Sequence, residues 1–258
     1  MLQEIRLKRI TALLASLQQV STERVAQDLG VSRETVRRDV LQLEAQGSLR
    51  RVHGGIVALT ESHPEPPLAV RRTARAAEKR AIARAALRLV EPGQTLFIDA
   101  GSTTALLAEA LAVVHGLRVL TNGVELARRL NDQAARRVGI ETILLGGRLD
   151  DDGIATYGDI TVAEVHRYRA DLAMLSPVGI SAQHGASSYA LHEAVVARAM
   201  VSCAARCVIL ADHSKLGQTS RSIYAMPEQV GALVTDARGA QDATAHSFRQ
   251  AGCEVVVA

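Results

Sequence analysis

The stretch VSRETVRRDVLQLEAQGSLRRVHGGIVAL, residues 31–59, decides the fold of the first part of this chain. Ser32 can cap a helix, because a serine hydroxyl accepts a hydrogen bond from a backbone N–H group of the first turn. Gly47 ends that helix. Two short apolar runs follow, over 49–53 and 56–59, and the Gly-Gly pair near their junction is typical of a hairpin turn. The stretch therefore predicts a helix followed by a β-hairpin.

The residues before this stretch predict two more helices. One covers 2–18, where apolar side chains recur near helical spacing. The next is short, because Ser21 can cap it and Gly30 breaks it. Two helices, a tight glycine turn, a third helix and a hairpin together make a winged helix-turn-helix. We expect this domain over residues 1–60.

The charge of the chain is concentrated in this same region. Through residue 60 there are nine basic and six acidic residues, a net charge of +3 that equals the charge of the whole chain. The remaining residues contain 21 of each sign and are neutral. A basic domain attached to a neutral one favours an anionic polymer as the partner of the basic domain, although a solvated surface would show the same charge.

The third helix carries the candidate DNA contacts, because in a helix-turn-helix this helix lies in the major groove. Arg33 and Arg37 share one helix face, and their planar guanidinium groups suit guanine or phosphate. A solvated face is the alternative for these two arginines taken alone. The full set of predicted DNA-binding residues is Ser32, Arg33, Thr35, Arg37 and Arg38 on the helix, with Arg50, Arg51 and His53 on the hairpin. The predicted partner is double-stranded DNA, bound by a homo-oligomer, either dimer or tetramer.

A change in composition separates this domain from the rest of the chain. Three prolines within 64–67 exclude a continuous helix, so we expect a linker over 61–77. From residue 78 to 258, short apolar runs alternate with helical stretches, which predicts an α/β domain with a largely parallel sheet. The runs that predict strands are 95–98, 117–120, 142–145, 172–175, 208–210, 233–234 and 255–257.

The segment FIDAGSTT, residues 97–104, is the best ligand-site candidate in this second domain. It follows one predicted strand and precedes a helical run, and its small residues and hydroxyls can donate hydrogen bonds to a phosphate or carboxylate. A capped helix after a tight turn is the alternative. Loops at 121–123, 146–148 and 212–215 also follow strands, and such loops converge at the carboxyl edge of a sheet.

Both domains resemble those of the DeoR family of bacterial sugar-metabolism regulators. Residues 20–59 resemble its N-terminal domain, and the matching elements are Val31-Ser32, Thr35-Val36-Arg37-Arg38-Asp39, Leu43-Glu44, Gly47, Leu49, Arg51 and His53-Gly54-Gly55. The resemblance continues in EKRAIARAA, DAGSTT, LTNG, LLGG and ILADHSK, which resemble its sensor domain. That domain resembles the ribose-5-phosphate isomerase fold and, in the family, binds phosphorylated sugars or related metabolites. The implied effector-binding residues are Asp99, Gly101, Ser102, Thr103, Thr104, Asn122, Gly147, Glu193 and Lys215, and Tyr157, Gly158 and Gly179 lie at matching loops.

The sequence also departs from the family pattern. Val178 stands where many members have an acidic residue, Ala197 stands where many have lysine, and His213 replaces a common serine. The part of the pocket that recognises the rest of the ligand is therefore expected to differ. An isomerase-like enzyme with an accessory head is the main alternative function, but isomerisation needs a placed carboxylate, and Val178 cannot supply one. Asp99 and Glu193 would be poor substitutes.

Composition narrows the remaining classes of function. The charged start MLQEIRLKRI does not fit a signal peptide and no run is long enough to span a membrane, so we expect a cytoplasmic protein. The three cysteines form no CxxC pair, and we expect no metal site, cofactor or catalytic residue. A nucleoid-type protein would leave the second domain without a role. The predicted function is a regulator, specifically a repressor of a carbohydrate or sugar-acid catabolic operon, controlled by a small anionic, phosphorylated metabolite.

Overall fold

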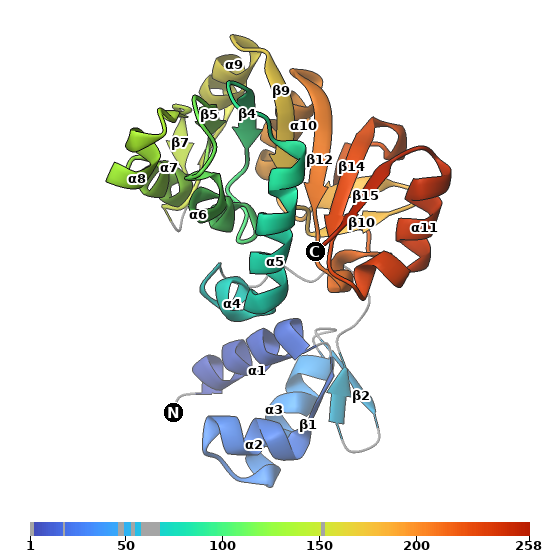
Figure 1. Cartoon of the computed structure of the whole chain (residues 1–258). Coiled ribbons are helices and arrows are strands. Elements are labelled where there is room, and N and C mark those ends of the chain that lie inside the picture. The colour runs from blue at the N-terminus through green and yellow to red at the C-terminus, as the bar shows by residue number, and fades with distance from the viewer. Residues whose placement is uncertain (1–2, 18, 46–48, 53–54, 58–67, 151–152) are drawn as a thin grey trace. The chain divides into compact units, whose positions relative to one another are not determined.

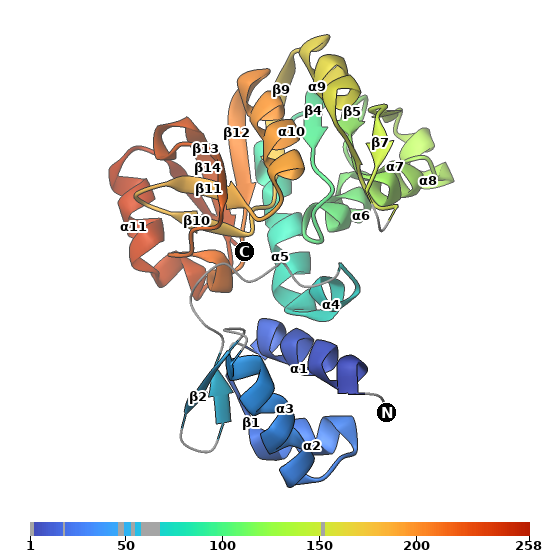
Figure 2. The ribbon, with the colours of Figure 1, turned by 180° about the vertical axis from the view of Figure 1, so that it is seen from behind.

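The computed structural model describes residues 3–17, 19–45, 49–52, 55–57, 68–150 and 153–258. The chain divides into two compact units, Met1–Ala74 and Arg75–Ala258, which we call the head and the body. In Figures 1 and 2 the colour runs from blue at the start of the head to red at the end of the body. Within the described residues, no helix combines the length and the apolar character that crossing a membrane requires.

The three predicted helices of the head are present. They are α1 (Gln3–Leu17), α2 (Thr22–Leu29) and α3 (Arg33–Ala45). Ser21 caps α2, because its hydroxyl accepts a hydrogen bond from the Arg24 N–H group at 3.1 Å. Gly30 ends α2 in the left-handed conformation, with φ at 63°. Ser32 caps α3 in the same way as Ser21, with the Thr35 N–H group at 3.1 Å.

The sheet of the head has three strands where the sequence predicts two. The strands are β1 (Gln19–Ser21), β2 (Arg50–Val52) and β3 (Gly55–Val57), in the antiparallel order β1-β3-β2. β1 is too short to show an alternating pattern in the sequence, and it is a strand because it pairs with β3. Buried side chains from all three helices and from the sheet form one core, among them Leu14, Val25, Val36 and Ile56.

The prolines predict a linker over 61–77, but part of this segment is helical. Helix α4 (Leu68–Thr73) lies inside it and α5 begins at Ala76, so the described part of this segment is largely helical. Alanine and arginine are good helix formers, and they dominate the sequence once the prolines have ended. The boundary between the two units accordingly falls after Ala74. The prolines themselves lie outside the described residues.

A seven-stranded parallel sheet forms the centre of the body, in the order β15-β14-β12-β9-β4-β5-β6. Each strand coincides with or overlaps one of the seven predicted runs, so the α/β prediction is confirmed. The strands are β4 (Thr95–Ile98), β5 (Arg118–Thr121), β6 (Glu141–Leu144), β9 (Ala170–Leu175), β12 (Ala204–Leu210), β14 (Val230–Thr235) and β15 (Glu254–Val257).

Helices cover both faces of this sheet (Figures 1 and 2). Leu96 and Ile98 of β4 face a core with α5, α6 and α7, while Phe97 faces a second core with α9, α10 and α11. Alternate strand residues point to opposite faces, so one apolar run serves both cores. The helices are α5 (Ala76–Ala86), α6 (Leu107–Leu111), α7 (Val124–Leu130), α8 (Gln133–Arg137), α9 (Asp159–His166), α10 (Leu191–Ser202) and α11 (Ala243–Gln250).

Two smaller sheets of the body were not predicted. One contains β10 (Gly179–Ser181), β11 (Gly185–Ser188) and β13 (Ser222–Ala225), and the other pairs β7 (Arg148–Leu149) with β8 (Thr156–Tyr157). Their glycine and serine residues give no apolar alternation. Five short 3₁₀ helices complete the body: η1 (Leu87–Leu89), η2 (Thr104–Leu106), η3 (His213–Lys215), η4 (Pro227–Gln229) and η5 (Gly239–Gln241).

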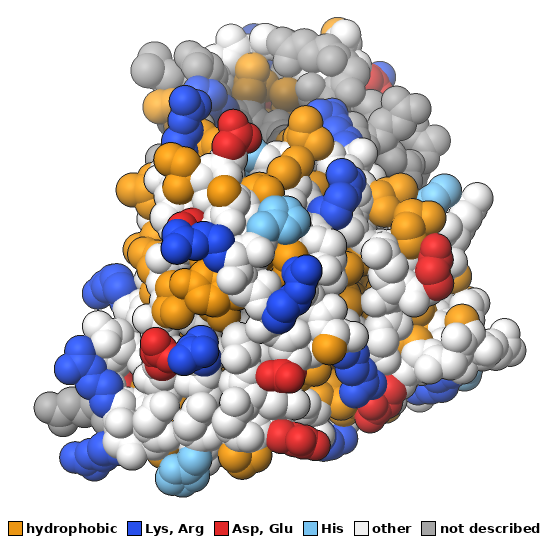
Figure 3. Space-filling view, turned by 90° about the horizontal axis from the view of Figure 1, so that it is seen from above, with side chains coloured by type: hydrophobic (Ala, Val, Ile, Leu, Met, Phe, Trp, Pro, Cys, Tyr) orange, Lys and Arg blue, Asp and Glu red, His pale blue; other side chains and the backbone are white. Residues whose placement is uncertain are grey.

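The surface charges and the cysteines of the body show two further features of this domain. On the face seen in Figure 3, basic and acidic side chains are interspersed with apolar ones. The three cysteines are free and buried. Burial raises the pKa of the Cys207 thiol to about 12 and that of Cys253 to about 11, so both thiols stay protonated at neutral pH. Among the described residues, no group of His, Cys, Asp and Glu could hold a metal ion.

Candidate functional site

The candidate DNA contacts of the head gather on the first half of α3. The side chains of Arg33, Arg37 and Arg38 are 75%, 67% and 75% exposed. Arg33 pairs with Glu23, while Arg37 and Arg38 both pair with Glu34, at 3.1 and 3.3 Å. The hydrogen bond from Arg37 is the main reason that the pKa of Glu34 is lowered. Exposed pairs of this kind contribute little stability, so the arginines can exchange glutamate for phosphate at small cost.

The remaining candidates of the head have different surroundings. Ser32 and Thr35 share a hydrogen bond between their hydroxyls at 2.8 Å. Arg51 on β2 contacts Glu44 of α3 at 2.5 Å, and its N–H group donates to the same carboxylate at 3.2 Å. These bonds fasten the hairpin to α3, and the backbone hydrogen bond is the main cause of the lowered pKa of Glu44. Arg50 lies on β2, and His53 lies outside the described residues.

In the body, Asp99 organises the loop that follows β4. Its Oδ1 accepts hydrogen bonds from Thr104 Oγ1 at 2.7 Å and from the Gly101 N–H group at 3.1 Å. Its Oδ2 accepts from the Ser176 N–H group at 2.8 Å, which connects the ends of β4 and β9. Desolvation raises the pKa of Asp99, although these hydrogen bonds and the charge of Lys215 act in the opposite direction. Asp99 therefore shapes the loop with both of its oxygens.

Close packing explains the glycines at two of the predicted positions. A Cβ atom on Gly101 would lie 2.7 Å from the Cβ atom of Ser176. A Cβ atom on Gly147 would lie 2.0 Å from Thr161 Oγ1, and this residue also has φ at 144°, a conformation that side chains rarely adopt. Both loops therefore depend on glycine for their shape.

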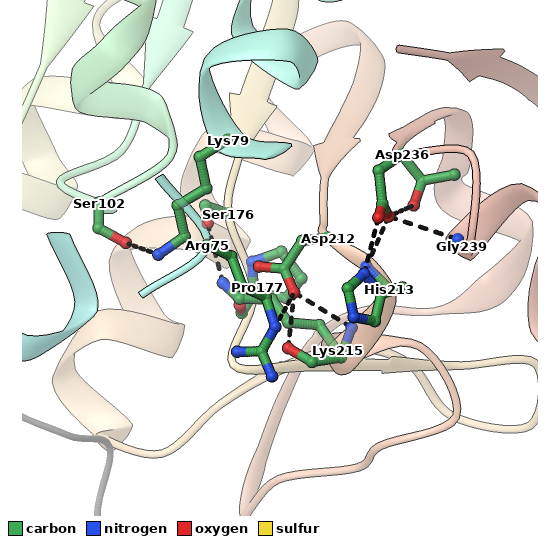
Figure 4. A network of polar contacts seen from close by, with 12 residues as sticks. Arg75, Lys79, Ser102, Ser176, Pro177, Asp212, His213, Lys215, Asp236 and Gly239 are labelled. Carbon is green, nitrogen blue, oxygen red and sulfur yellow. Dashed lines mark hydrogen bonds and ion pairs between the residues drawn. The ribbon is translucent and has the colours of Figure 1, made fainter. Parts of the chain in front are cut away.

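Two lysines lie beside the loops of β4 and β9 (Figure 4). Lys215, on η3, donates from Nζ to Ser176 Oγ at 3.1 Å and to the Pro177 carbonyl. Lys79, on α5, is only 4% exposed and donates to Ser102 Oγ at 3.1 Å. Lys79 is buried and Lys215 is partly buried, so the two ammonium groups place positive charge beside the loops that follow β4 and β9.

Two buried polar atoms, one in the loop after β4 and one in the loop after β5, have no hydrogen-bond partner among the described residues. They are Thr103 Oγ1 and Asn122 Oδ1. The other end of the Asn122 side chain is engaged, because Nδ2 donates to the Thr156 carbonyl at 3.0 Å. An unpaired buried polar atom costs free energy, and a polar ligand would supply the missing partner.

The other predicted effector residues lie on α10 and next to the pair of strands β7 and β8. Glu193 accepts a hydrogen bond from Ser188 Oγ at 2.5 Å, and the rings of Tyr157 and His192 lie 4.5 Å apart. Gly147 precedes β7, the partner strand of β8, on which Tyr157 lies. The structure thus places Glu193 and Gly147 near Tyr157, whereas the contacts of Asp99 connect it to Lys215 through Ser176.

Sequence reasoning missed Lys79, although a signal was present. Lys79 occupies the same helical stripe as Ile82, Ala83 and Ala86, all buried, and a lysine within an apolar stripe is unusual. Ser176 and Arg75 were also missed, and nothing local distinguishes them. Of the departures from the family pattern, Val178 joins β11 through its N–H group at 2.9 Å from the Ser187 carbonyl, and Ala197 is buried in α10.

Comparisons with known proteins identify a family for each of the two domains. The DeoR-like helix-turn-helix domain matches residues 6–62, and the DeoR C terminal sensor domain matches residues 74–237. The HTH-type transcriptional repressor GlcR of Bacillus subtilis is 35% identical over 92% of this chain and 89% of its own length. The glycerol-3-phosphate regulon repressor of Escherichia coli is 32% identical over 84% of each chain.

A comparison with solved structures also finds an isomerase. Ribose 5-phosphate isomerase from Plasmodium falciparum is 16% identical to this chain, and the match covers 54% of this chain and 52% of that one. The TM-score is 0.38, a likeness too low to carry a conclusion.

Proposed function

This chain belongs to the DeoR family of transcriptional regulators, and from that premise we propose that an anionic metabolite bound to its body controls how its head binds DNA. The chain is a DNA-binding regulator with a C-terminal sensor domain. The isomerase-like alternative gains no support, because the relatives named above are repressors and Val178 supplies no carboxylate.

The exposed arginines of α3 support DNA binding through this helix. Arg33 and Arg37 lie four positions apart, near its N-terminus, where a recognition helix contacts base edges. Their weak pairs with glutamates can be exchanged for guanine or phosphate contacts. A gel-shift assay with the DNA that flanks the gene of this protein tests the idea. We expect salt-sensitive binding with a preference for sequence, and the absence of both would refute it.

The observation that carries the effector proposal is the combination of two lysines with two unpartnered polar atoms at one sheet edge. Lys79 and Lys215 supply positive charge, the Thr103 hydroxyl can donate a hydrogen bond, and Asn122 Oδ1 can accept one. This set fits a phosphoryl group attached to a hydroxylated carbon skeleton. Phosphate oxygens are met by the donors, and a ligand hydroxyl by Asn122. We therefore propose a phosphorylated sugar or polyol.

Thermal-shift measurements on the full chain test this ligand class. Glycerol 3-phosphate, glucose 6-phosphate, inorganic phosphate and gluconate make a suitable panel. A ligand present at a hundred times its Kd stabilises the folded state by about 2.7 kcal/mol. In a domain of this size we expect the melting temperature to rise by about 5–10 °C with a phosphorylated compound. A larger shift with gluconate than with either sugar phosphate would reverse the assignment to phosphate.

We also infer that the protein is a repressor and a homo-oligomer. The relatives from B. subtilis and E. coli are named repressors. Helix-turn-helix proteins read symmetric half-sites as dimers, so two heads are needed for one operator. A reporter gene under the adjacent promoter should be expressed more strongly when this gene is deleted. Sedimentation of the purified chain should give a dimer or tetramer, and a monomer at micromolar concentration would contradict the proposal.

A further inference from the structure

Arg75 has an unusual backbone conformation at the junction of the two units. It is the N-cap of α5 and the first residue of the body, directly after Ala74. Its φ and ψ are 52° and 40°, and it is the one residue other than glycine with positive φ in the part of the chain that the structure describes. L-residues rarely adopt this left-handed conformation, because Cβ crowds the following carbonyl. Some other interaction must therefore hold Arg75 there.

An ion pair joins the Arg75 side chain to Asp212. Arg75 Nε lies 3.6 Å from Asp212 Oδ1, and the Asp212 side chain is only 2% exposed (Figure 4). The same carboxylate caps η3, where it accepts hydrogen bonds from the Ser214 N–H group at 3.1 Å and from Ser214 Oγ at 2.6 Å. Because η3 also carries Lys215, the pair connects the junction directly to the proposed effector loop.

One turn later, α5 makes a second connection to the site. Lys79 follows Arg75 by four positions and lies in the first turn of α5. Lys79 contacts Ser102 in the β4 loop, whereas Arg75 contacts Asp212 in the β12 loop. The first turn of α5 is closed by a hydrogen bond from the Lys79 N–H group to the Arg75 carbonyl at 3.0 Å. The β4 loop and the β12 loop of the proposed site thus both contact the first turn of α5 or its N-cap.

We propose that Arg75 is a latch, which holds the first turn of α5 in its strained conformation until an anion binds near Lys79 and Lys215. This inference rests on the proposed function of the site. A phosphoryl group there competes with Ser102 for Lys79 and with Asp212 for Arg75. Its charge therefore draws Arg75 away from Asp212. Without the ion pair, Arg75 returns to negative φ, and the direction in which the chain enters α5 changes. The body thereby has two states that one ligand can bias.

Hydrogen exchange of the full chain with inorganic phosphate as the probe tests the latch. In the wild type, phosphate should slow exchange in the loop 99–106, where it binds. It should speed exchange of the Lys79 amide at least threefold, because leaving the left-handed conformation breaks the bond to the Arg75 carbonyl. Direct contact of phosphate with this turn would slow the amide instead, so the sign of the change separates latch release from simple binding.

Two variants and one control complete the experiment. Arg75→Gly adopts the left-handed conformation without strain, so phosphate should still protect 99–106 but should no longer alter exchange at Lys79. Arg75→Gln keeps the strain and loses the charge, so its Lys79 amide should exchange faster even without phosphate. Arg84→Ala, an exposed arginine on the same helix, should behave like the wild type.

The outcomes separate the latch from the site on which it rests. Protection of 99–106 with an unchanged or slower Lys79 amide in the wild type would overturn the latch and leave the effector site standing. The same holds if Arg75→Gly retains the faster exchange. If millimolar phosphate fails to protect 99–106 in the wild type, the proposed site is wrong, and the latch falls with it.

Discussion

The cations of the head and those of the body differ in exposure, although both sets are candidates for binding anions. The arginines of α3 are two-thirds to three-quarters exposed, and their partners are exposed glutamates. Lys79 is almost fully buried, and it and Lys215 contact hydroxyl and carbonyl groups of loops. An exposed row of guanidinium groups suits a long polyanion that must be approached from outside, whereas enclosed ammonium groups suit a small anion that must fit between loops. Enclosure, rather than the number of charges, separates the two kinds of site.

The largest effect is expected where the head contains an enclosed pair of its own. Arg6 Nε and Nη2 contact the carboxylate of Asp39 at 2.6 and 3.0 Å, and Asp39 is 1% exposed. Asp39→Ala removes the buried carboxylate that Arg6 contacts, so we expect the head to melt about 10 °C lower and DNA binding to be lost at moderate temperature. Circular dichroism melts measure this change. Asp28→Ala removes a carboxylate from an exposed pair with Arg24 and should shift the melt little, and equal shifts would show that enclosure does not matter.

Removal of an exposed arginine should affect DNA binding alone. We expect Arg37→Ala to weaken operator binding about ten- to hundredfold, because a guanidinium fork on a base or phosphate is lost. The thermal shift caused by glycerol 3-phosphate should stay the same. Gel shifts and thermal melts measure the two properties. Arg136→Ala, which removes the same charge from α8 of the body, serves as the control, and an equal loss of DNA binding there would indicate a general charge effect.

Removal of the partly buried Lys215 should produce the opposite pattern. We expect Lys215→Ala to weaken binding of glycerol 3-phosphate about tenfold or more, because a charged hydrogen-bond donor is lost from the site. Operator binding without the metabolite should be preserved. Titration calorimetry and gel shifts measure these effects. Arg169→Ala, an exposed cation of the body, should change neither, and a loss of operator binding in Lys215→Ala would mean that the two sites are assigned wrongly.

The smallest effect concerns the glutamate that pairs with two arginines of α3. Glu34→Gln removes the partner of Arg37 and Arg38, so we expect operator binding to strengthen by about threefold at low salt and less at high salt. Fluorescence anisotropy at two salt concentrations measures the change. Glu164→Gln, which acts on a similar pair with Arg167 in the body, should leave it unaltered. Weaker DNA binding in Glu34→Gln would mean that these pairs position the arginines instead of competing for them.

Local signals in the sequence were sufficient for most of the secondary structure. The caps at Ser21 and Ser32 lie where the sequence predicts them, and so do the seven strands of the large sheet. The small sheets were missed, because glycine and serine strands such as β11 carry no apolar alternation. The three-residue strand β1 becomes recognisable only through its pairing with β3.

The candidate site was predicted in part, for a reason that lies in the packing. The loops after β4 and β12 could be found because polar residues follow apolar runs, and parallel strands bring such loops to one edge. The contact of Ser176 with Asp99 could not be predicted, because these residues are 77 positions apart and no single motif contains both. Lys79 was visible as a lysine within an apolar stripe, yet its contact with Ser102 depends on how α5 lies against the sheet.

The sequence alone determined that a basic winged helix-turn-helix precedes a neutral α/β domain, because capping, periodicity and charge act within a few residues of one another. Tertiary structure alone decided which cations are enclosed and what they touch. Burial and desolvation depend on segments distant in the chain, and these bury Lys79 and partly bury Lys215 beside the loops of the proposed site while Arg33, Arg37 and Arg38 stay open to solvent.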